Sequence, residues 1–193
     1  IIGNGGFSRE FQAYIQDNRM NNEYGYFYEP SVYQTDKSFF STKRKGIVFI
    51  AIGDPNVKQE IYNKLCEQEY IGKLLYNYNF GKIYDDYQTT LDLGTIICPG
   101  SIITTNVRIG KFVIINLNVT VGHDTEIGDF TTVSPGANIS GNVKIGKRCY
   151  IGTNASIKEG ISICDDVVIG ANSFVNKDIL HPGTFVGLPA RRI

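Results

Sequence analysis

An aliphatic side chain recurs at every sixth position through the C-terminal half of the chain. The series runs unbroken from Leu91 to Val175, and a small or β-branched residue follows four positions after many of its members. A period of six matches neither the 3.6-residue turn of an α-helix nor the alternation of a strand. It is typical of a solenoid in which each hexad supplies one short strand and one corner. The aliphatic positions are Leu91, Ile97, Ile103, Ile109, Ile115, Val121, Ile127, Val133, Ile139, Ile145, Ile151, Ile157, Ile163, Ile169 and Val175.

Glycine often occupies the position directly after the aliphatic residue, as at Gly110, Gly128 and Gly146. We interpret these glycines as relaxing the corner backbone where φ becomes positive. The pattern resembles the hexapeptide-repeat family, which implies three hexads per coil and a left-handed parallel β-helix. On that basis the fifteen hexads predict five coils, stacked about 4.8 Å apart. No repeating threonine array marks one face, as it would in an ice-binding solenoid.

The N-terminal part of the chain lacks this period and reads as an α/β unit. Apolar runs at Ile1–Ile2 and Ile47–Ile52 are each followed by a glycine-containing turn and a helical pattern. We therefore predict a Rossmann-like βαβ domain over residues 1–88 and a β-helix domain over residues 89–193. In the first predicted helix Ser8 is the candidate N-cap, and the helix ends at about Asn18. Phe11 and Ile15 are expected to face inward. The second predicted helix carries Val57, Ile61 and Leu65.

The turns after such strands are places where phosphate groups bind, because free N–H groups at a helix start attract anions. The first turn carries Gly3, Gly5 and Ser8 at the spacing of a dinucleotide fingerprint but lacks its third glycine. No acidic residue follows about 20 positions later in a clear second strand. A single nucleotide moiety is therefore the predicted ligand, in preference to NAD.

Charge and composition narrow the function classes. Lys+Arg and Asp+Glu are both 19, which argues against a protein that binds nucleic acid through its phosphates. No apolar run approaches the roughly 20 residues that span a bilayer, and nothing reads as a signal peptide. The four cysteines have no metal-ligand spacing. We expect a cytoplasmic protein with reduced thiols, no metal and no membrane insertion.

Five segments, spread over nearly the whole chain, are similar to the sugar acyltransferases of the PglD/NeuD type. They are Ile2–Gly6, Ala51–Asp54, Gly122–Asp124, Val133–Ala137 and Val186–Ala190. In that family a short βαβ domain holds a nucleotide sugar and the β-helix uses acetyl-CoA as co-substrate. The resemblance implies N-acetylation of the amino group of a nucleotide-linked 4-amino-4,6-dideoxy sugar.

His123 is the candidate general base. It lies two positions after Val121, at a corner of the predicted helix, and Asp124 follows it directly. An amine loses a proton as it attacks a thioester, and imidazole titrates near neutral pH. An adjacent carboxylate can fix the tautomer and stabilise the imidazolium, and the resemblance gives Asp124 this role.

Gly141 follows His123 by one 18-residue coil, so its N–H is a candidate oxyanion donor. The resemblance adds Asn116 near the catalytic centre and places Thr132 where well-studied relatives have a second histidine. Phe7 stands where many relatives have a histidine, and its ring either stacks on a base or sugar or packs. The resemblance further implies acetyl-CoA contacts at Gly141, Thr132, Thr153, Ala171 and Pro189. It implies contacts to the sugar nucleotide at Gly3, Asn4, Gly5, Gly6, Phe7, Asp36 and Gly53.

Two alternatives to N-acetylation stay open. O-acetylation of a sugar hydroxyl, as on sialic acid, uses the same machinery, and a solenoid without catalysis can serve as a binding module. A γ-type carbonic anhydrase is excluded, because it needs three histidine ligands for zinc and this chain has two histidines in all.

Phe112, Ile114 and Tyr150 are predicted to lie exposed on the flat faces of the solenoid. Exposed apolar faces are commonly covered by association. The resemblance implies a homotrimer with active sites at the subunit boundaries and coenzyme A lying along the edge of the helix.

Overall fold

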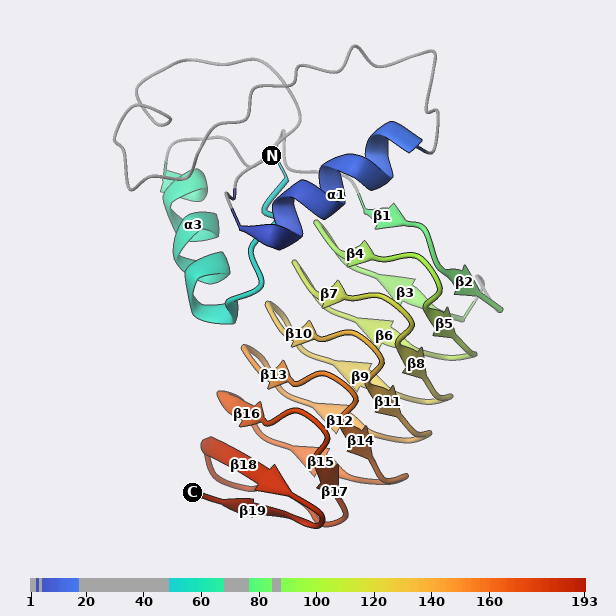
Figure 1. The fold of residues 1–193 in the computed structure, drawn as a ribbon, viewed down its shortest axis with the longest axis vertical. Coiled ribbons are helices and arrows are strands. Elements are labelled where there is room, and N and C mark those ends of the chain that lie inside the picture. Colours follow the sequence, from blue (N-terminus) through green and yellow to red (C-terminus); the bar gives the residue numbers. More distant parts are fainter. Residues whose placement is uncertain (1–2, 4, 18–48, 68–76, 85–87) are drawn as a thin grey trace. The chain divides into compact units, whose positions relative to one another are not determined.

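The computed structural model describes residues 3, 5–17, 49–67, 77–84 and 88–193. The C-terminal unit is a β-solenoid whose short parallel strands stack coil upon coil in three sheets, from β1 at one end to β17 near the other (Figure 1). The seventeen strands β1 to β17, at three per coil, make nearly six coils. This confirms the solenoid that the six-residue period predicts.

Each sheet takes one strand from each coil. The eight-stranded sheet contains β1 (Tyr78–Asn79), β4 (Ile96–Ile97), β7 (Ile114–Ile115), β10 (Thr132–Val133), β13 (Tyr150–Ile151), β16 (Val167–Ile169), β18 (Gly183–Gly187) and β19 (Ala190–Arg192). The six-stranded sheet contains β2 (Lys82–Ile83), β5 (Ile102–Ile103), β8 (Thr120–Val121), β11 (Asn138–Ile139), β14 (Ser156–Ile157) and β17 (Phe174–Val175). The five-stranded sheet contains β3 (Thr90–Leu91), β6 (Arg108–Ile109), β9 (Glu126–Ile127), β12 (Lys144–Ile145) and β15 (Ser162–Ile163).

The solenoid starts earlier in the sequence than the run of aliphatic residues does. Strand β1 pairs with β4, and β2 pairs with β5, so a coil precedes the one that the period first marks. The six-residue pattern does not reveal this coil, because Asn79 and not an aliphatic residue stands opposite Ile97. In addition, Lys82 pairs with Ile102 at a separation of 20 residues, whereas later coils are separated by 18. The solenoid therefore exceeds the five coils expected from the sequence.

The periodic aliphatic residues form a continuous interior. From Ile97 to Val175 every one of them is buried, and the small residues four positions later, such as Val107 and Ala137, are buried with them. Hydroxyl groups replace some of these small residues and bond between coils. Thr95, Ser101, Thr125 and Thr131 each donate to a backbone carbonyl fifteen residues further along. No buried side-chain polar atom of the described residues lacks a hydrogen-bond partner.

The glycines after the aliphatic residues serve packing rather than a positive φ. Gly110, Gly128 and Gly146 are not among the positive-φ residues of the solenoid. A Cβ at Gly128 would instead lie 2.6 Å from the backbone carbon of Gly146 in the next coil. A Cβ at Gly110 would lie 2.5 Å from the Asp129 carboxylate. The expectation that these glycines relax the corner was wrong: they let successive coils approach.

Positive φ falls instead on the second residue of each two-residue corner turn. Asparagine, aspartate and glycine hold most of these positions, as expected for the left-handed conformation. Phe112 and Phe130 are bulky exceptions, and their buried rings stack at 5.8 Å between centroids. The positions are Gly94, Gly100, Asn106, Phe112, Asn118, Asp124, Phe130, Gly136, Asn142, Arg148, Asn154, Gly160, Asp166 and Asn172.

Two of the three residues expected on exposed faces are buried within a single chain. Phe112 and Ile114 each expose 2% of their surface, and Tyr150 is half-buried. Covering them therefore does not require association. The large apolar side chains that do lie exposed in the described solenoid include Ile102, Val168, Leu180 and Leu188.

Two helices are described in the N-terminal unit. Helix α1 (Gly6–Asp17) buries Phe11, and helix α3 (Pro55–Glu67) buries Ile61 and Leu65. Both helices match the sequence prediction, but α1 begins two residues before the predicted cap. The hydroxyl of Ser8 donates to the Gly5 carbonyl at 2.8 Å instead of accepting from the helix. Asp54 caps α3 by accepting the Asn56 N–H at 2.9 Å. The predicted strand residues 1–2 and 47–48 lie outside the described residues.

Ile139→Asp is expected to prevent soluble folding, because its carboxylate would enter the dry interior where Ile139 exposes 2% of its surface. Asn138→Asp is the matched control, since Asn138 precedes Ile139 in β11 and faces solvent. The yield of soluble protein and the thermal melt by circular dichroism measure both. Equal tolerance of the two substitutions would contradict the observed register.

Candidate functional site

The turn between β8 and β9 carries the predicted base and its acid. His123 and Asp124 are the two residues of this turn, and Asp124 adopts the left-handed conformation with φ 58°. Its carboxylate Oδ2 lies 2.7 Å from Nδ1 of His123. Both side chains are about half exposed, at 54% and 50%. We call the column of turns between the six-stranded and five-stranded sheets the His123 corner; it contains Thr105–Asn106, His123–Asp124, Gly141–Asn142 and Glu159–Gly160.

The geometry of this pair sets the tautomer of the imidazole. A carboxylate only accepts hydrogen bonds, so in the neutral imidazole Nδ1 of His123 carries the proton and Nε2 has the lone pair. A hydrogen bond from His123, which has the larger effect, and a second one from Asn106 hold the pKa of Asp124 below its ordinary value. Asp124 is therefore a carboxylate at neutral pH, and it orients the His123 ring so that Nε2 is the nitrogen directed away from it.

Gly141 lies one coil beyond His123 and supports the imidazole. A Cβ built on Gly141 would stand 2.5 Å from Nε2 and 2.6 Å from Cε1 of His123. No side chain larger than hydrogen fits there without displacing the ring. Glycine at this position is explained by close approach, since Gly141 is not among the positive-φ glycines.

The N–H of Gly141 has no acceptor among the described residues. It belongs to the first residue of a corner turn, whose N–H takes no part in the ladder between coils. Elsewhere aspartates satisfy this group: Asp129 accepts from Lys111 N–H at 3.0 Å, and Asp165 accepts from Lys147 N–H at 2.8 Å. The His123 corner thus presents a proton acceptor beside a free backbone donor, which is the pair that acyl transfer needs.

Asn116 and Thr132 lie away from this corner within one chain. Asn116 follows β7 at the next corner of the same coil, where its Oδ1 accepts the Leu117 N–H at 2.8 Å. Thr132 is on β10 in the eight-stranded sheet and exposes 3% of its surface. Strand β8 separates Asn116 from His123, so a single chain does not bring these residues together.

The residues predicted to contact acetyl-CoA gather on a different corner. Thr153 and Ala171 occupy the same turn position in successive coils, joined by the Asn172 N–H, which donates to the Thr153 carbonyl at 2.8 Å. Pro189 lies between β18 and β19, and the Gly187 N–H ties this hairpin to Ser173 Oγ at 3.0 Å. We call this column of turns, between the eight-stranded and six-stranded sheets, the Thr153 corner; it contains Leu117–Asn118, Pro135–Gly136, Thr153–Asn154 and Ala171–Asn172.

The glycines predicted to bind the nucleotide differ in their surroundings. A Cβ on Gly3 would lie 2.5 Å from the carbonyl oxygen of Ala51, so Gly3 is required for packing. A Cβ on Gly5, Gly6 or Gly53 meets no described atom within 4 Å. These three positions therefore leave room for a ligand at the helix starts. The ring of Phe7 stacks on Phe11 at 6.3 Å, and Asn4 and Asp36 lie outside the described residues.

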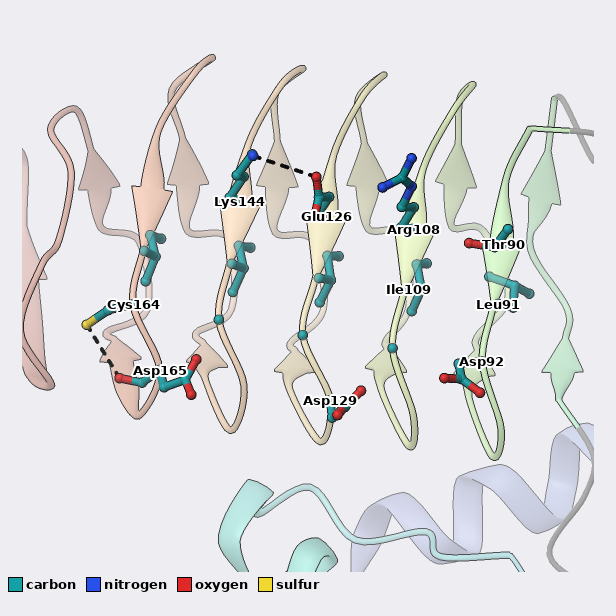
Figure 2. Close-up of a pocket in the computed structure, with 16 residues that line it drawn as sticks. Thr90, Leu91, Asp92, Arg108, Ile109, Glu126, Asp129, Lys144, Cys164 and Asp165 are labelled. Carbon is teal, nitrogen blue, oxygen red and sulfur yellow. Dashed lines mark hydrogen bonds and ion pairs between the residues drawn. The ribbon is translucent and has the colours of Figure 1, made fainter.

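A shallow groove runs along the five-stranded sheet, and none of the predicted site residues lines it (Figure 2). Arg108, Glu126 and Lys144 form a row along the sheet, and Lys144 pairs with Glu126 at 3.7 Å. Asp129 pairs with Lys147 at 3.0 Å on the bordering turns. Because the groove contains none of the predicted base, acid or donor residues, we take the His123 corner as the candidate site.

The sequence analysis missed Asn106, whose Nδ2 donates to Asp124 Oδ1 at 2.6 Å. Its only signal was its place 18 residues before Asp124. No cluster of three metal-ligating side chains occurs in the part of the chain that the structure describes. None of the described helices combines the length and apolarity needed to cross a membrane.

Comparison with known proteins shows which proteins this chain is similar to. The family model for the hexapeptide repeat of succinyl-transferase matches residues 142–177. The structure of WeeI from Acinetobacter baumannii matches with a TM-score of 0.82 and 27% identity over 99% of this chain and 97% of that chain. This chain is therefore similar to acyltransferases that carry the hexapeptide repeat.

Two solved structures of acetyltransferases are also similar to this chain. A variant of perosamine N-acetyltransferase from Caulobacter crescentus, in complex with CoA and GDP-perosamine, matches with a TM-score of 0.71 and 26% identity over 77% of this chain and 69% of that chain. The acetyltransferase domain of PglB from Neisseria gonorrhoeae shares the fold, with a TM-score of 0.83 and 22% identity over 99% of this chain and 97% of that chain.

Gly141→Ala is expected to lower kcat by about tenfold or more while leaving the thermal melt nearly unchanged. The new methyl group meets the movable imidazole and not the backbone, so it displaces His123 more than it strains the fold. Steady-state kinetics and a thermal melt measure the two effects.

The control for Gly141→Ala is the double variant with His123→Ala. If the glycine acts by seating the imidazole, the double variant is no slower than His123→Ala alone. Fully additive losses would show that Gly141 acts independently of His123.

Proposed function

We propose that this protein transfers the acetyl group of acetyl-CoA to the amino group of a nucleotide-linked 4-amino-4,6-dideoxy sugar. The observation that carries the proposal is the His123 corner, where Asp124 leaves Nε2 of His123 free to accept a proton beside the open N–H of Gly141. The similar enzyme from Caulobacter crescentus, with CoA and GDP-perosamine bound, supports both the donor and the class of acceptor.

The proposed reaction begins when the sugar amine attacks the thioester carbonyl carbon. Nε2 of His123 takes the proton that the amine loses, and Asp124 stabilises the resulting imidazolium. The N–H of Gly141 donates to the oxyanion that forms on the carbonyl oxygen. The C–S bond then breaks, the sulfur of CoA takes a proton, and the products are the N-acetylated sugar and free CoA.

We infer that the site is completed by a neighbouring copy of the chain in a homotrimer. His123, Asp124 and Gly141 lie on one corner, whereas Asn116, Thr153 and Ala171 lie on another. One face of the solenoid, about six residues or roughly 20 Å of extended chain, separates the two corners. A second subunit that brings its Thr153 corner to the His123 corner would supply the missing contacts. Thr153 and Ala171 also present turn N–H groups that have no acceptor among the described residues, and these suit the amide groups of coenzyme A.

We assign the nucleotide to a Rossmann-like N-terminal domain, at the starts of α1 and α3. The open space at Gly5, Gly6 and Gly53 supports this, because a phosphate can then approach free N–H groups at the first turn of a helix. Phe7 packs on Phe11 and borders the same turn.

His123→Gln is expected to lower kcat/KM for acetyl transfer by about 10²–10⁴-fold, the range for a positioned general base. The Kd for acetyl-CoA is expected to stay the same. Thiol release, followed with a panel of UDP-, dTDP- and GDP-linked amino sugars, measures turnover, and calorimetry measures binding. The alkali stability of the product separates an amide from an ester, which have the same mass. His181→Gln, which changes the only other histidine, is the control, and near-native turnover of the His123 variant would overturn the assignment.

Gly6→Val is expected to raise KM for the sugar nucleotide by at least about tenfold, because its side chain would fill the space that a phosphate needs. The KM for acetyl-CoA is expected to stay within about twofold, since that site is built on the solenoid. Gly3→Ala is the contrasting variant. Its methyl group meets the Ala51 carbonyl oxygen, so it is expected to lower the melting temperature. If both KM values rise together in Gly6→Val, the turn is a folding element and not a nucleotide site.

A further inference from the structure

Asn106 makes a hydrogen bond to the acid of the catalytic pair. Its Nδ2 donates to Oδ1 of Asp124 at 2.6 Å, while Oδ2 of the same carboxylate faces Nδ1 of His123 at 2.7 Å. Each carboxylate oxygen therefore has its own donor, from two different coils. We propose that Asn106 is a positioning residue, which orients Asp124 and through it the imidazole of His123; this rests on the proposed function, in which His123 is the base.

The fold places these residues in line. Asn106 and Asp124 hold the same position in successive corner turns, 18 residues apart, with φ angles of 54° and 58°. The Asp124 N–H also donates to the Thr105 carbonyl at 3.2 Å, which fixes the spacing of the two turns. The amide of Asn106 thus reaches Asp124 from the preceding coil, while Gly141 lies against the imidazole from the following coil.

A carboxylate held by one hydrogen bond can turn about its Cβ–Cγ bond, and a half-exposed one does so readily. The Asn106 amide removes this freedom by holding Oδ1, so that Oδ2 stays directed at His123. It also favours the ionised form of Asp124, and with the bond from His123 it lowers the pKa of that carboxyl group. Both effects keep the proton on Nδ1 and the lone pair on Nε2.

The alternative explanation is that Asn106 only satisfies the left-handed backbone of a corner. Five asparagines hold this position in the described solenoid, and asparagine tolerates it well. Among these five, the structure records a side-chain hydrogen bond for Asn106 alone. The other four are Asn118, Asn142, Asn154 and Asn172.

Glycine separates the two explanations, because it occupies the same position at Gly94, Gly100, Gly136 and Gly160. Asn106→Gly keeps the left-handed backbone and removes the amide. Asn142→Gly is the matched control: Asn142 has φ 54°, lies in the same column one coil beyond Asp124, and has no recorded side-chain hydrogen bond in the described structure.

We expect Asn106→Gly to lower kcat about three- to tenfold, as for the loss of a hydrogen bond to a charged group. The KM for acetyl-CoA and the melting temperature are expected to match those of Asn142→Gly. Equal kcat values for the two variants would overturn the proposal.

Asn106→Asp adds a pH readout that a purely structural role would not move. A second carboxylate beside Asp124 stabilises the imidazolium, so the free base appears only at higher pH. The acid limb of kcat/KM is expected to shift upward by at least about half a pH unit. An unchanged profile would contradict the proposal. The other charged groups on the elements flanking this corner are Arg108, Glu126, Lys144, Lys158, Glu159, Lys177 and Asp178.

NMR of the imidazole nitrogens tests the inference without any substrate. The chain has two histidines, and a His181→Gln variant assigns their signals. Wild type is expected to show the Nδ1–H tautomer at His123, and Asn106→Gly a mixture of tautomers. A tautomer unchanged in Asn106→Gly would overturn the proposal. If it changes but no amino sugar is acetylated by wild type, the positioning role stands and the proposed function fails.

Discussion

Backbone hydrogen bonds between successive coils are the constraint on which the rest of this structure depends. The Gly122 N–H donates to the Ile139 carbonyl at 2.8 Å, and the same step of about one coil recurs along all three sheets. Because this ladder fixes which residue stands over which, a separation of 18 in sequence becomes direct contact. Asn106 meets Asp124 in this way, and Arg148 meets Asp166 at 2.8 Å. The chemistry of a corner is therefore set by pairs of residues one coil apart.

The same ladder explains how much of the fold the sequence predicts. Every coil repeats the same environment, so the interior aliphatic positions return at a fixed period and can be identified without a structure. The first coil breaks that period at Asn79 and Lys82, and the pattern therefore does not reveal it. The glycines that follow the aliphatic residues were expected to provide a positive φ at the corners, and this explanation was wrong. A glycine that recurs at one position shows that the fold needs either space for a neighbouring atom or a positive φ there. Only the structure decides between the two, since a Cβ on Gly128 would meet the backbone of Gly146. The burial of Phe112 and Ile114 was likewise not predicted, because both stand beside interior residues and were expected to lie on exposed faces.

The candidate site shows a similar division. His123 and Asp124 can be proposed from sequence because the chain has only two histidines and the chemistry of a histidine beside an aspartate is evident. Asn106 cannot, because asparagine is ordinary at a left-handed corner position and gains a role only from the carboxylate in the next coil. The period does place Asn116 and His123 at different corners, since they follow Ile115 and Val121 in successive hexads, but the resemblance alone led us to expect them in one catalytic centre.

The catalysis that we propose for this corner depends on a backbone N–H group that the hydrogen-bond ladder leaves unbonded. The first residue of a corner turn has an N–H outside the ladder, and the fold repeats this group in every coil. At other corners a side chain uses it, as Asp129 does for Lys111 and Asp165 does for Lys147. At Gly141 no described side chain does so, and the absence of a Cβ lets the imidazole of His123 lie against it. A proton acceptor and an oxyanion donor are thereby held side by side on rigid backbone, so little reorganisation is needed when charge develops. Aspartates stand 18 residues beyond Lys111 and Lys147, whereas Glu159 stands 18 residues beyond Gly141 and makes no recorded bond to its N–H, so a change of one residue type in a repeated position is enough to leave this donor open.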